Sequence, residues 1–120
     1  MHNPVDPKRG EVWNINFDPA VGAEIQKKRP AIVISDNAIG KLPLRIIVPV
    51  TDWKISYEKY HWFVKLDPTP INGLSKLSGA DAFQVKSLST KRFADQLGTL
   101  TDSQVDDIAS AIALCVGTPV

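Results

Sequence analysis

The chain is poor in the residues that build disulfide frameworks and metal centres. Cys115 is the single cysteine among 120 residues, and His2 and His61 are the only histidines. One thiol cannot form an internal disulfide, which favours a reducing, cytoplasmic environment. These three side chains are a poor basis for a structural zinc site, and no glycine-rich phosphate loop is present. We therefore expect no metal and no cofactor.

Long apolar runs and an excess of charge are also missing. No stretch approaches the roughly 20 apolar residues of a membrane span, and the N-terminal residues lack the apolar core of a secretory signal. The formal net charge is +1, so no overall basic field points to a nucleic acid. Any contact with RNA or DNA must come from local clusters. One cluster is Lys27, Lys28 and Arg29, and the other is Lys86, Lys91 and Arg92.

A length of 120 residues with 43% hydrophobic residues predicts a single packed domain. The Pro-rich residues 1–8 are predicted to form a flexible tail, and residues 9–117 to form the domain. Alternation and short apolar runs predict several strands. Pro49, which lacks a ladder donor, predicts a bulge or a sheet edge near the end of its strand. The expected strands cover residues 11–17, 30–35, 44–51, 61–66 and 79–86, and the segment near Phe93 and Leu97 is ambiguous.

The end of the chain carries clear helix signals. Thr101 and Gln104 have the spacing of a capping box, and Leu100 and Val105 occupy the positions of a hydrophobic staple. Apolar residues then recur at helical spacing until Gly117. Several short strands followed by one helix, without alternation of the two, predict a mainly β fold. We expect a small, strongly curved sheet or partial barrel with a C-terminal helix over one face.

Two polar residues stand next to apolar runs and have side chains suited to phosphate. Arg29 comes just before the run Ala31–Ile34, and Thr51 ends the next predicted strand. A guanidinium pairs with phosphate oxygens bidentately, and a hydroxyl can donate to the same group. If both strands belong to one small sheet, these side chains can converge. The alternatives stay open at this level: Arg29 as a solvated surface cation, and Thr51 as a strand residue that caps a turn.

The remaining candidates have weaker signals. Glu24 can accept a proton or be a solvated acid, and it lies in residues 18–28, which are predicted to form a long mobile loop. His61 starts an alternating strand and is interpreted as a rim residue. Cys115 lies near the apolar side of the helix and suits packing better than nucleophilic attack. Three aromatic residues can stack unpaired bases or pack in a core or dimer interface, with neither favoured: Trp53, Tyr57 and Tyr60.

Several motifs together resemble the MazF/PemK family of toxin endoribonucleases. The chain reads Arg9-Gly10-Glu11-Val12-Trp13, then Asp18-Pro19-Ala20-Val21-Gly22-Ala23-Glu24. The likeness continues through Arg29-Pro30-Ala31-Ile32-Val33-Ile34-Ser35 and Ile47-Val48-Pro49-Val50-Thr51. Residues 77–88 resemble a second signature of the family. The resemblance covers most of residues 9–116.

The resemblance implies a CcdB/PemK-type fold, a small SH3-like barrel with a terminal helix, that works as a homodimer. It implies metal-independent, sequence-specific cleavage of single-stranded RNA, with Arg29 stabilising the pentacoordinate phosphate and Thr51 holding it. Glu24 and Gln84 map near the RNA groove. A MazE-like antitoxin with an acidic or amphipathic segment is the expected partner at this groove. Three of the four lysines of the basic clusters complete the predicted RNA-binding set: Lys27, Lys28 and Lys86.

The chain departs from the family pattern at two points. Ala23 stands where a serine often precedes the glutamate, and Ser35-Asp36-Asn37 replaces a segment that commonly contains glutamine. We expect both changes to affect the choice of bases more than the chemistry. Two other functions stay open. One is a gyrase poison of the CcdB type, disfavoured because residues 114–120 lack a tryptophan, and the other is a domain that binds RNA without cutting it.

Overall fold

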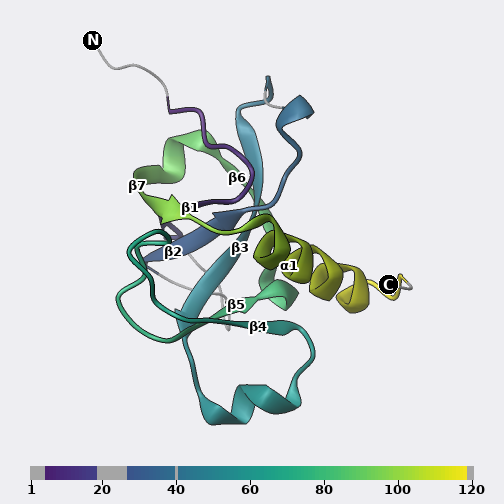
Figure 1. Cartoon of the computed structure of the whole chain (residues 1–120). Helices are drawn as coiled ribbons and strands as arrows, with labels where there is room; N and C mark the ends of the chain where they lie inside the picture. Colours follow the sequence, from purple (N-terminus) through teal and green to yellow (C-terminus); the bar gives the residue numbers. More distant parts are fainter. Residues whose placement is uncertain (1–4, 19–26, 40, 119–120) are drawn as a thin grey trace.

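The computed structural model describes residues 5–18, 27–39 and 41–118 (Figure 1). Within these ranges the chain forms an antiparallel β-sheet, one α-helix and four short 3-10 helices. The strands are β1 (Glu11–Asn16), β2 (Lys28–Val33), β3 (Leu44–Asp52), β4 (Phe63–Leu66), β5 (Ser78–Asp81), β6 (Lys86–Ser89) and β7 (Phe93–Thr99). The helices are α1 (Asp102–Cys115), η1 (Asn37–Ile39), η2 (Ile55–Lys59), η3 (Ala82–Gln84) and η4 (Thr90–Arg92).

β3 is the centre of the sheet because three strands pair with it. The order across the sheet is β4-β5-β3-β2-β1-β7, and β6 pairs with the first half of β3. β2 pairs with Ile47–Pro49, and β5 pairs with Val50–Asp52. One strand that changes partner along its length bends the sheet. The predicted mainly β fold with one terminal helix is confirmed.

Pro49 lies inside this central strand and not at a sheet edge. It is fully buried and stands opposite Ala31 of β2. On the other side of β3, pairing with β6 ends at Ile47 and pairing with β5 begins at Val50. A residue without an N–H donor is tolerated at such a change of partner. Of the two predicted alternatives, a bulge or a sheet edge, the edge is therefore wrong, and Pro49 stands at a gap between the ladders with β6 and β5.

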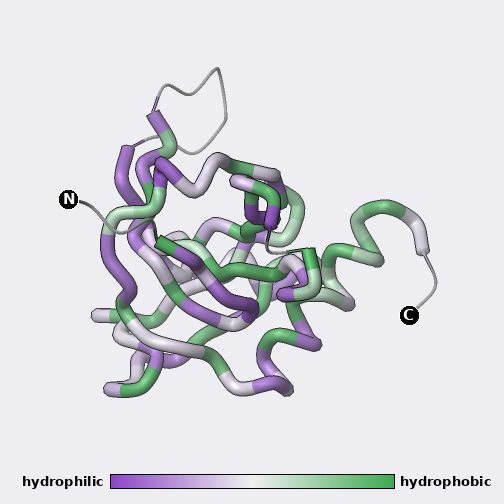
Figure 2. The backbone as a smooth tube through the Cα atoms, turned by 90° about the horizontal axis from the view of Figure 1, so that it is seen from above, coloured by the Kyte–Doolittle hydropathy of each residue, from purple (hydrophilic) through white to green (hydrophobic). Residues whose placement is uncertain are grey.

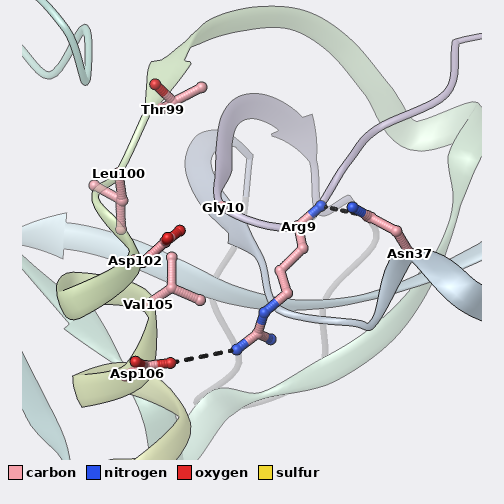
Figure 3. Close-up of a pocket in the computed structure, with 8 residues that line it drawn as sticks. All are labelled: Arg9, Gly10, Asn37, Thr99, Leu100, Asp102, Val105 and Asp106. Carbon is pink, nitrogen blue, oxygen red and sulfur yellow. Dashed lines mark hydrogen bonds and ion pairs between the residues drawn. The ribbon is translucent and has the colours of Figure 1, made fainter.

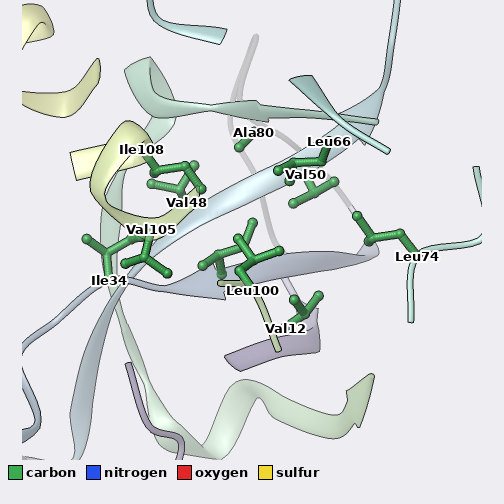
Figure 4. Packing of buried hydrophobic residues seen from close by; sticks show 11 residues of the cluster. Val12, Ile34, Val48, Val50, Leu66, Leu74, Ala80, Leu100, Val105 and Ile108 are labelled. Carbon is green, nitrogen blue, oxygen red and sulfur yellow. The ribbon is translucent and has the colours of Figure 1, made fainter. Parts of the chain in front are cut away.

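Alternate residues of the strands face two separate buried clusters. The first cluster lies under α1 and joins Ile32 and Val48 of the sheet to Ile108 of the helix (Figure 4). The second cluster lies on the opposite face and includes Ile15 and Ala31. Figure 2 shows short hydrophobic and hydrophilic stretches alternating along the chain. The second half of β2, Ala31 to Val33, is buried on both faces.

The structure corrects the bounds of two predicted strands. β2 begins at Lys28, so Arg29 lies inside the strand, opposite Ile15 of β1, and not before it. The predicted strand over residues 79–86 is divided, because the Asp81 carboxylate accepts the Phe83 N–H and caps η3. The ambiguous segment near Phe93 is strand β7, which pairs with β1 through two irregularities in register. Its residues are mostly exposed, so no alternation marks it.

α1 begins at the predicted signals. Thr101 Oγ1 accepts the Gln104 N–H at 3.2 Å, and Gln104 Oε1 accepts the Thr101 N–H at 3.0 Å. Leu100 and Val105 are buried in the first cluster, which completes the hydrophobic staple. In the described ranges, no helix is long and apolar enough to cross a membrane.

The replacement Thr101→Ala is expected to lower the free energy of unfolding by about 1 kcal/mol, because it removes one acceptor of the capping box. Ser103→Ala provides the control, since Ser103 is exposed in the first turn of the same helix. Urea unfolding of both variants and the parent protein measures the difference. Equal stability of the two variants would contradict the capping role.

The end of the predicted tail packs on the domain through a buried arginine. Arg45 Nε donates to Pro7 O at 2.9 Å, and Arg45 Nη2 lies 2.8 Å from Asp6 Oδ1. Pro7 is fully buried. Hydrogen bonds from Lys8 and Arg45 lower the pKa of the Asp6 carboxyl below its ordinary value. The first four residues of the predicted tail lie outside the described residues.

Candidate functional site

Arg29 and Thr51 lie on the same face of the sheet and line one hollow. Ala31 stands opposite Pro49 in the ladder between β2 and β3. The same register, continued by two residues, sets Arg29 opposite Thr51. Both residues share strand parity with the second cluster, on the face away from α1. The hollow that they line measures about 130 Å³. The structure thus brings these two predicted residues together.

The hollow contains a second cation and a carboxylate. Lys76 Nζ lies 3.1 Å from Asp52 Oδ2, and both residues line the hollow beside Arg29 and Thr51. Lys76 thus offsets the negative charge of Asp52 next to Thr51. With the guanidinium of Arg29 included, the formal charges of the lining residues sum to +1. Ser75 and the buried Ser78 add hydroxyls to the wall of the hollow. A small, positive, hydroxyl-rich hollow suits an oxyanion such as a phosphodiester.

Arg29 and Thr51 are both half-buried, so water only partly screens their interactions with a bound anion. A guanidinium can give two parallel N–H donors to the oxygens of one phosphate, and a threonine hydroxyl can give a third. Preorganised donors of this kind stabilise negative charge that develops on phosphorus during transfer. Arg29 is held in β2 by its pairing with β1, and Thr51 is held in β3 by its pairing with β5.

The ends of the predicted loop between β1 and β2 are held close together. The Phe17 N–H donates to Lys27 O at 3.0 Å, and the Lys27 N–H donates to Asp18 Oδ1 at 2.7 Å. Arg92 Nη1 of the second basic cluster donates to Asp18 O at 2.6 Å. The two basic clusters of the sequence therefore meet at the base of this connection. Glu24 and its neighbours in the loop lie outside the described residues.

Two of the predicted RNA-binding lysines contact side chains beside this loop base. Lys28 Nζ lies 3.9 Å from Asp95 Oδ1 of β7, and Lys86 Nζ lies 5.7 Å from the centre of the Phe17 ring. Neither lysine lines the hollow of Arg29 and Thr51. The two lysines form a basic border on the β1 side of the sheet. There they can neutralise the phosphates of a nucleic acid that flank a phosphate bound in the hollow.

Gln84 lies at the end of η3 and is oriented by a buried carboxylate. Gln84 Nε2 donates to Asp81 Oδ2 at 3.1 Å. Burial raises the pKa of the Asp81 carboxyl above its ordinary value, although the hydrogen bonds act in the opposite direction. Burial, and after it the charge of Asp81, also raises the pKa of the Cys115 thiol. A thiol held protonated in this way is a poor nucleophile, which supports the interpretation of Cys115 as a packing residue.

The aromatic residues that follow Thr51 pack against one another. The rings of Tyr57 and Phe63 stack at 3.9 Å with an interplanar angle of 6°, and Trp53 meets Tyr57 edge-on at 5.7 Å. Tyr60 stacks on Trp62 at 4.8 Å. These rings form a ledge over β4 and η2, on the β4 side of the hollow. His61 is exposed beside the ledge.

A larger hollow of about 510 Å³ lies elsewhere, between the Arg9 turn and the first turns of α1 (Figure 3). Arg9 Nη2 lies 3.9 Å from Asp106 Oδ1, and the Arg9 N–H donates to Asn37 Oδ1 at 2.8 Å. Asp102 adds a second carboxylate to the lining. None of the predicted site residues lines this hollow, and its two carboxylates disfavour a phosphate.

Sequence reasoning missed four polar residues of the Arg29 hollow. Asp52 had a signal, because it directly follows Thr51. Ser75 and Lys76 come from the connection between β4 and β5, which has no periodicity and whose only sequence signal is a cluster of chain breakers, and Ser78 is the first residue of β5. Among the described residues, no group of three or more His, Cys, Asp or Glu side chains is placed to hold a metal ion.

Comparison with known protein families gives a match that covers almost the whole chain. Residues 8–116 match the family described as PemK-like, MazF-like toxin of type II toxin-antitoxin system. The chain therefore belongs to this family of toxins. The observed motifs at Arg9 to Glu24, Arg29 to Ser35 and Ile47 to Thr51 all fall inside the matched range.

Particular relatives agree with this family. Endoribonuclease MazF9 of Mycobacterium tuberculosis is 29% identical over 113 residues, which cover 89% of this chain and 93% of the relative. The crystal structure of MazF from Deinococcus radiodurans has a TM-score of 0.80 at 27% identity and covers 95% of this chain and 99% of its own. A chain of the MazE-MazF crystal structure (Form-II) from the same organism has a TM-score of 0.74 at 26% identity and covers 96% of this chain and 99% of its own.

Proposed function

We propose that this toxin is an endoribonuclease that cuts single-stranded RNA at preferred sequences without a metal ion. The observation that carries the proposal is the shared hollow of Arg29 and Thr51, whose lining has a net positive charge. RNA supplies its own nucleophile, the 2′-hydroxyl, so the protein need only align it, move protons and stabilise charge on phosphorus. The similarity to an endoribonuclease supports the same conclusion.

The proposed reaction forms a bond between the 2′-oxygen and phosphorus and breaks the bond between phosphorus and the 5′-oxygen. The 2′-hydroxyl proton leaves to a base, for which Glu24 is a candidate, and the departing 5′-oxygen takes up a proton. Arg29 holds the phosphate oxygens while the negative charge builds, and Thr51 donates its hydroxyl to one of them. The products are a 2′,3′-cyclic phosphate and a 5′-hydroxyl.

The border around the hollow would bind the rest of the RNA. Lys27, Lys28 and Lys86 neutralise phosphates on the β1 side. Gln84, held by Asp81, presents an amide that can read the edge of an unstacked base. We propose that the active form is a cytoplasmic homodimer and that a MazE-like antitoxin covers the same surface. The relative solved as MazE-MazF supports the existence of such a partner.

Incubation of the purified protein with a mixed RNA in excess EDTA tests the proposal. Discrete fragments with 2′,3′-cyclic phosphate and 5′-hydroxyl ends are the expected result, and mapping their ends gives the preferred sequence. RNA that stays intact while it is retained in a gel-shift assay would replace the proposal with an RNA-binding module. Intact RNA together with inhibited supercoiling by gyrase would favour a gyrase poison.

The replacement Thr51→Val is expected to lower kcat/KM for RNA about 10- to 100-fold, the range of a lost hydrogen bond to a charged group. Valine keeps the β-branched shape that suits β3, so the loss reports the hydroxyl and not the strand. Thr51→Ser restores the hydroxyl and should restore most of the rate. The same rate for Thr51→Val and the parent protein would remove Thr51 from the reaction.

A further inference from the structure

Four residues on four different strands form one row across the face that carries the hollow. Thr51 of β3 stands opposite Gly79 of β5, and Gly79 stands opposite Lys65 of β4. The register of Ala31 opposite Pro49, extended by two residues, sets Arg29 on the other side of Thr51, and both line one hollow. Residues directly opposite each other in antiparallel ladders point to the same face. The row therefore carries, in order, a guanidinium, a hydroxyl, a position without a side chain and an ammonium.

Aromatic rings fill the space above the side-chain-free position. A Cβ atom at Gly79 would lie 3.0 Å from Trp53 Cε3 and 3.3 Å from Phe63 Cδ1, so a larger residue would displace these rings. The Phe63 ring stands edge-on to the Trp53 ring, with an interplanar angle of 86°. Trp53 follows Thr51 by two residues, so the two rings lie over the row between Thr51 and Lys65.

The ammonium of Lys65 lies over the Trp53 ring. Lys65 Nζ lies 5.4 Å from the centre of the Trp53 ring, within the range of a cation–π contact. Lys65 is exposed, and none of the ion pairs found among residues 5–18, 27–39 and 41–118 includes it. Lys76, by contrast, has its charge matched by Asp52. Lys65 thus offers a positioned and unmatched positive charge on the same face as Arg29.

We infer that Lys65 binds a second phosphate of the RNA, on the β4 side of the phosphate held by Arg29 and Thr51. The inference rests on the proposed function. Two strand spacings separate Thr51 from Lys65, which is roughly 10 Å between Cα atoms, and the lysine side chain can lean back toward the hollow. The RNA backbone then crosses the strands along the row, over Trp53. Lys65 is a binding residue, and the bond-breaking step does not use it.

Binding of a 20-nucleotide 2′-O-methyl RNA of mixed sequence tests this inference, because the missing 2′-hydroxyl prevents cleavage. The dissociation constant is measured by fluorescence anisotropy between 50 and 300 mM KCl. Lys65→Gln is expected to weaken binding about two- to fivefold at low salt. It should also make the slope of log K against log salt shallower by about 0.7, the value for one phosphate contact on a single strand.

Two further variants identify the cause. Lys65→Arg keeps a cation over Trp53 and should retain both the affinity and the slope of the parent protein. Lys41→Gln removes the same charge from an exposed site before the other end of β3 and should leave the slope unchanged. With cleavable RNA, Lys65→Gln is expected to raise KM by the same factor and leave kcat unchanged.

The outcomes separate this inference from the proposed function. If Lys65→Gln has the slope of the parent protein, the second phosphate site is overturned, whether or not the parent protein cuts RNA. If Lys41→Gln makes the slope as shallow as Lys65→Gln does, the effect is one of net charge and the site is again overturned. If the slope changes only at Lys65 but the parent protein leaves RNA intact, the phosphate site stands and the nuclease proposal falls.

Discussion

Replacing Arg29 with alanine is expected to lower the rate of RNA cleavage at least a hundredfold. The guanidinium lines the same hollow as the Thr51 hydroxyl, and the other cation of that hollow, Lys76, forms an ion pair with Asp52. Removing one preorganised donor from a site that stabilises transition-state charge costs about 10²–10³ in rate. The loss should appear in kcat, because the charge on phosphorus grows only as the bond to the 2′-oxygen forms.

The replacement Arg29→Lys separates charge from geometry. Lysine keeps one positive charge but loses the planar fork that grips two oxygens, so an intermediate rate is expected. Thermal unfolding of both variants checks that β2 is intact. Arg29 is half-buried, so its replacement can also destabilise the fold. The melting temperature of each variant is therefore measured first, and a lower rate is assigned to catalysis only where the melting temperature is unchanged. A rate for Arg29→Ala within threefold of the parent protein, at unchanged stability, would end the catalytic role of Arg29.

The meeting of Arg29 and Thr51 was predictable from the sequence because it depends only on strand parity and pairing. Two neighbouring apolar runs pair as antiparallel strands, and the end of one then lies beside the start of the other. The exact bounds mattered little, since Arg29 lies inside β2 and still reaches the hollow. The capping box at Thr101 was equally predictable, because its two hydrogen bonds join residues three positions apart.

The rest of the hollow was not predictable, because it comes from a segment without a repeating pattern. Ser75 and Lys76 follow a turn that is held by hydrogen bonds of two side chains. Asn72 Oδ1 accepts the Thr69 N–H and the Leu74 N–H, and Thr69 Oγ1 accepts the Asn72 N–H, each at 3.0 Å. Such local bonds depend on individual side chains and leave no trace in hydropathy. The division of residues 79–86 has the same origin, since a single carboxylate at Asp81 starts η3.

The row through Gly79 and Lys65 could not be predicted from the sequence either. β5 pairs with β3, although about 25 residues and one other strand separate them along the chain. Which residue stands opposite Thr51 depends on the register of that distant ladder, and a shift of one residue would turn Lys65 to the other face. Periodicity assigns residues to faces of one strand only, and register between distant strands requires the packed structure.

The replacement Gly98→Ala is expected to destabilise the protein by about 3 kcal/mol or more, because its Cβ would collide with backbone. That atom would lie 2.1 Å from Ile71 O and 2.6 Å from Asn72 C. The Thr99 N–H donates to the same Ile71 carbonyl at 3.0 Å, so the two segments cannot separate without losing this bond. A fall in melting temperature on the order of 10 °C should follow.

Gly117→Ala is the matched control for the loss of a glycine. Gly117 has a φ of 79° but no atom within 4 Å of a new Cβ, so alanine there meets backbone strain without a collision. Its cost should be about 1–2 kcal/mol, clearly less than at Gly98.

The two variants should also differ in catalysis. The connection that passes Gly98 continues into Ser75 and Lys76, so folded Gly98→Ala protein should cleave RNA more slowly, whereas Gly117→Ala should cleave at the parent rate. Equal stability and equal rates for the two variants would show that the contact of Ile71 and Asn72 with β7 does not hold the hollow in place.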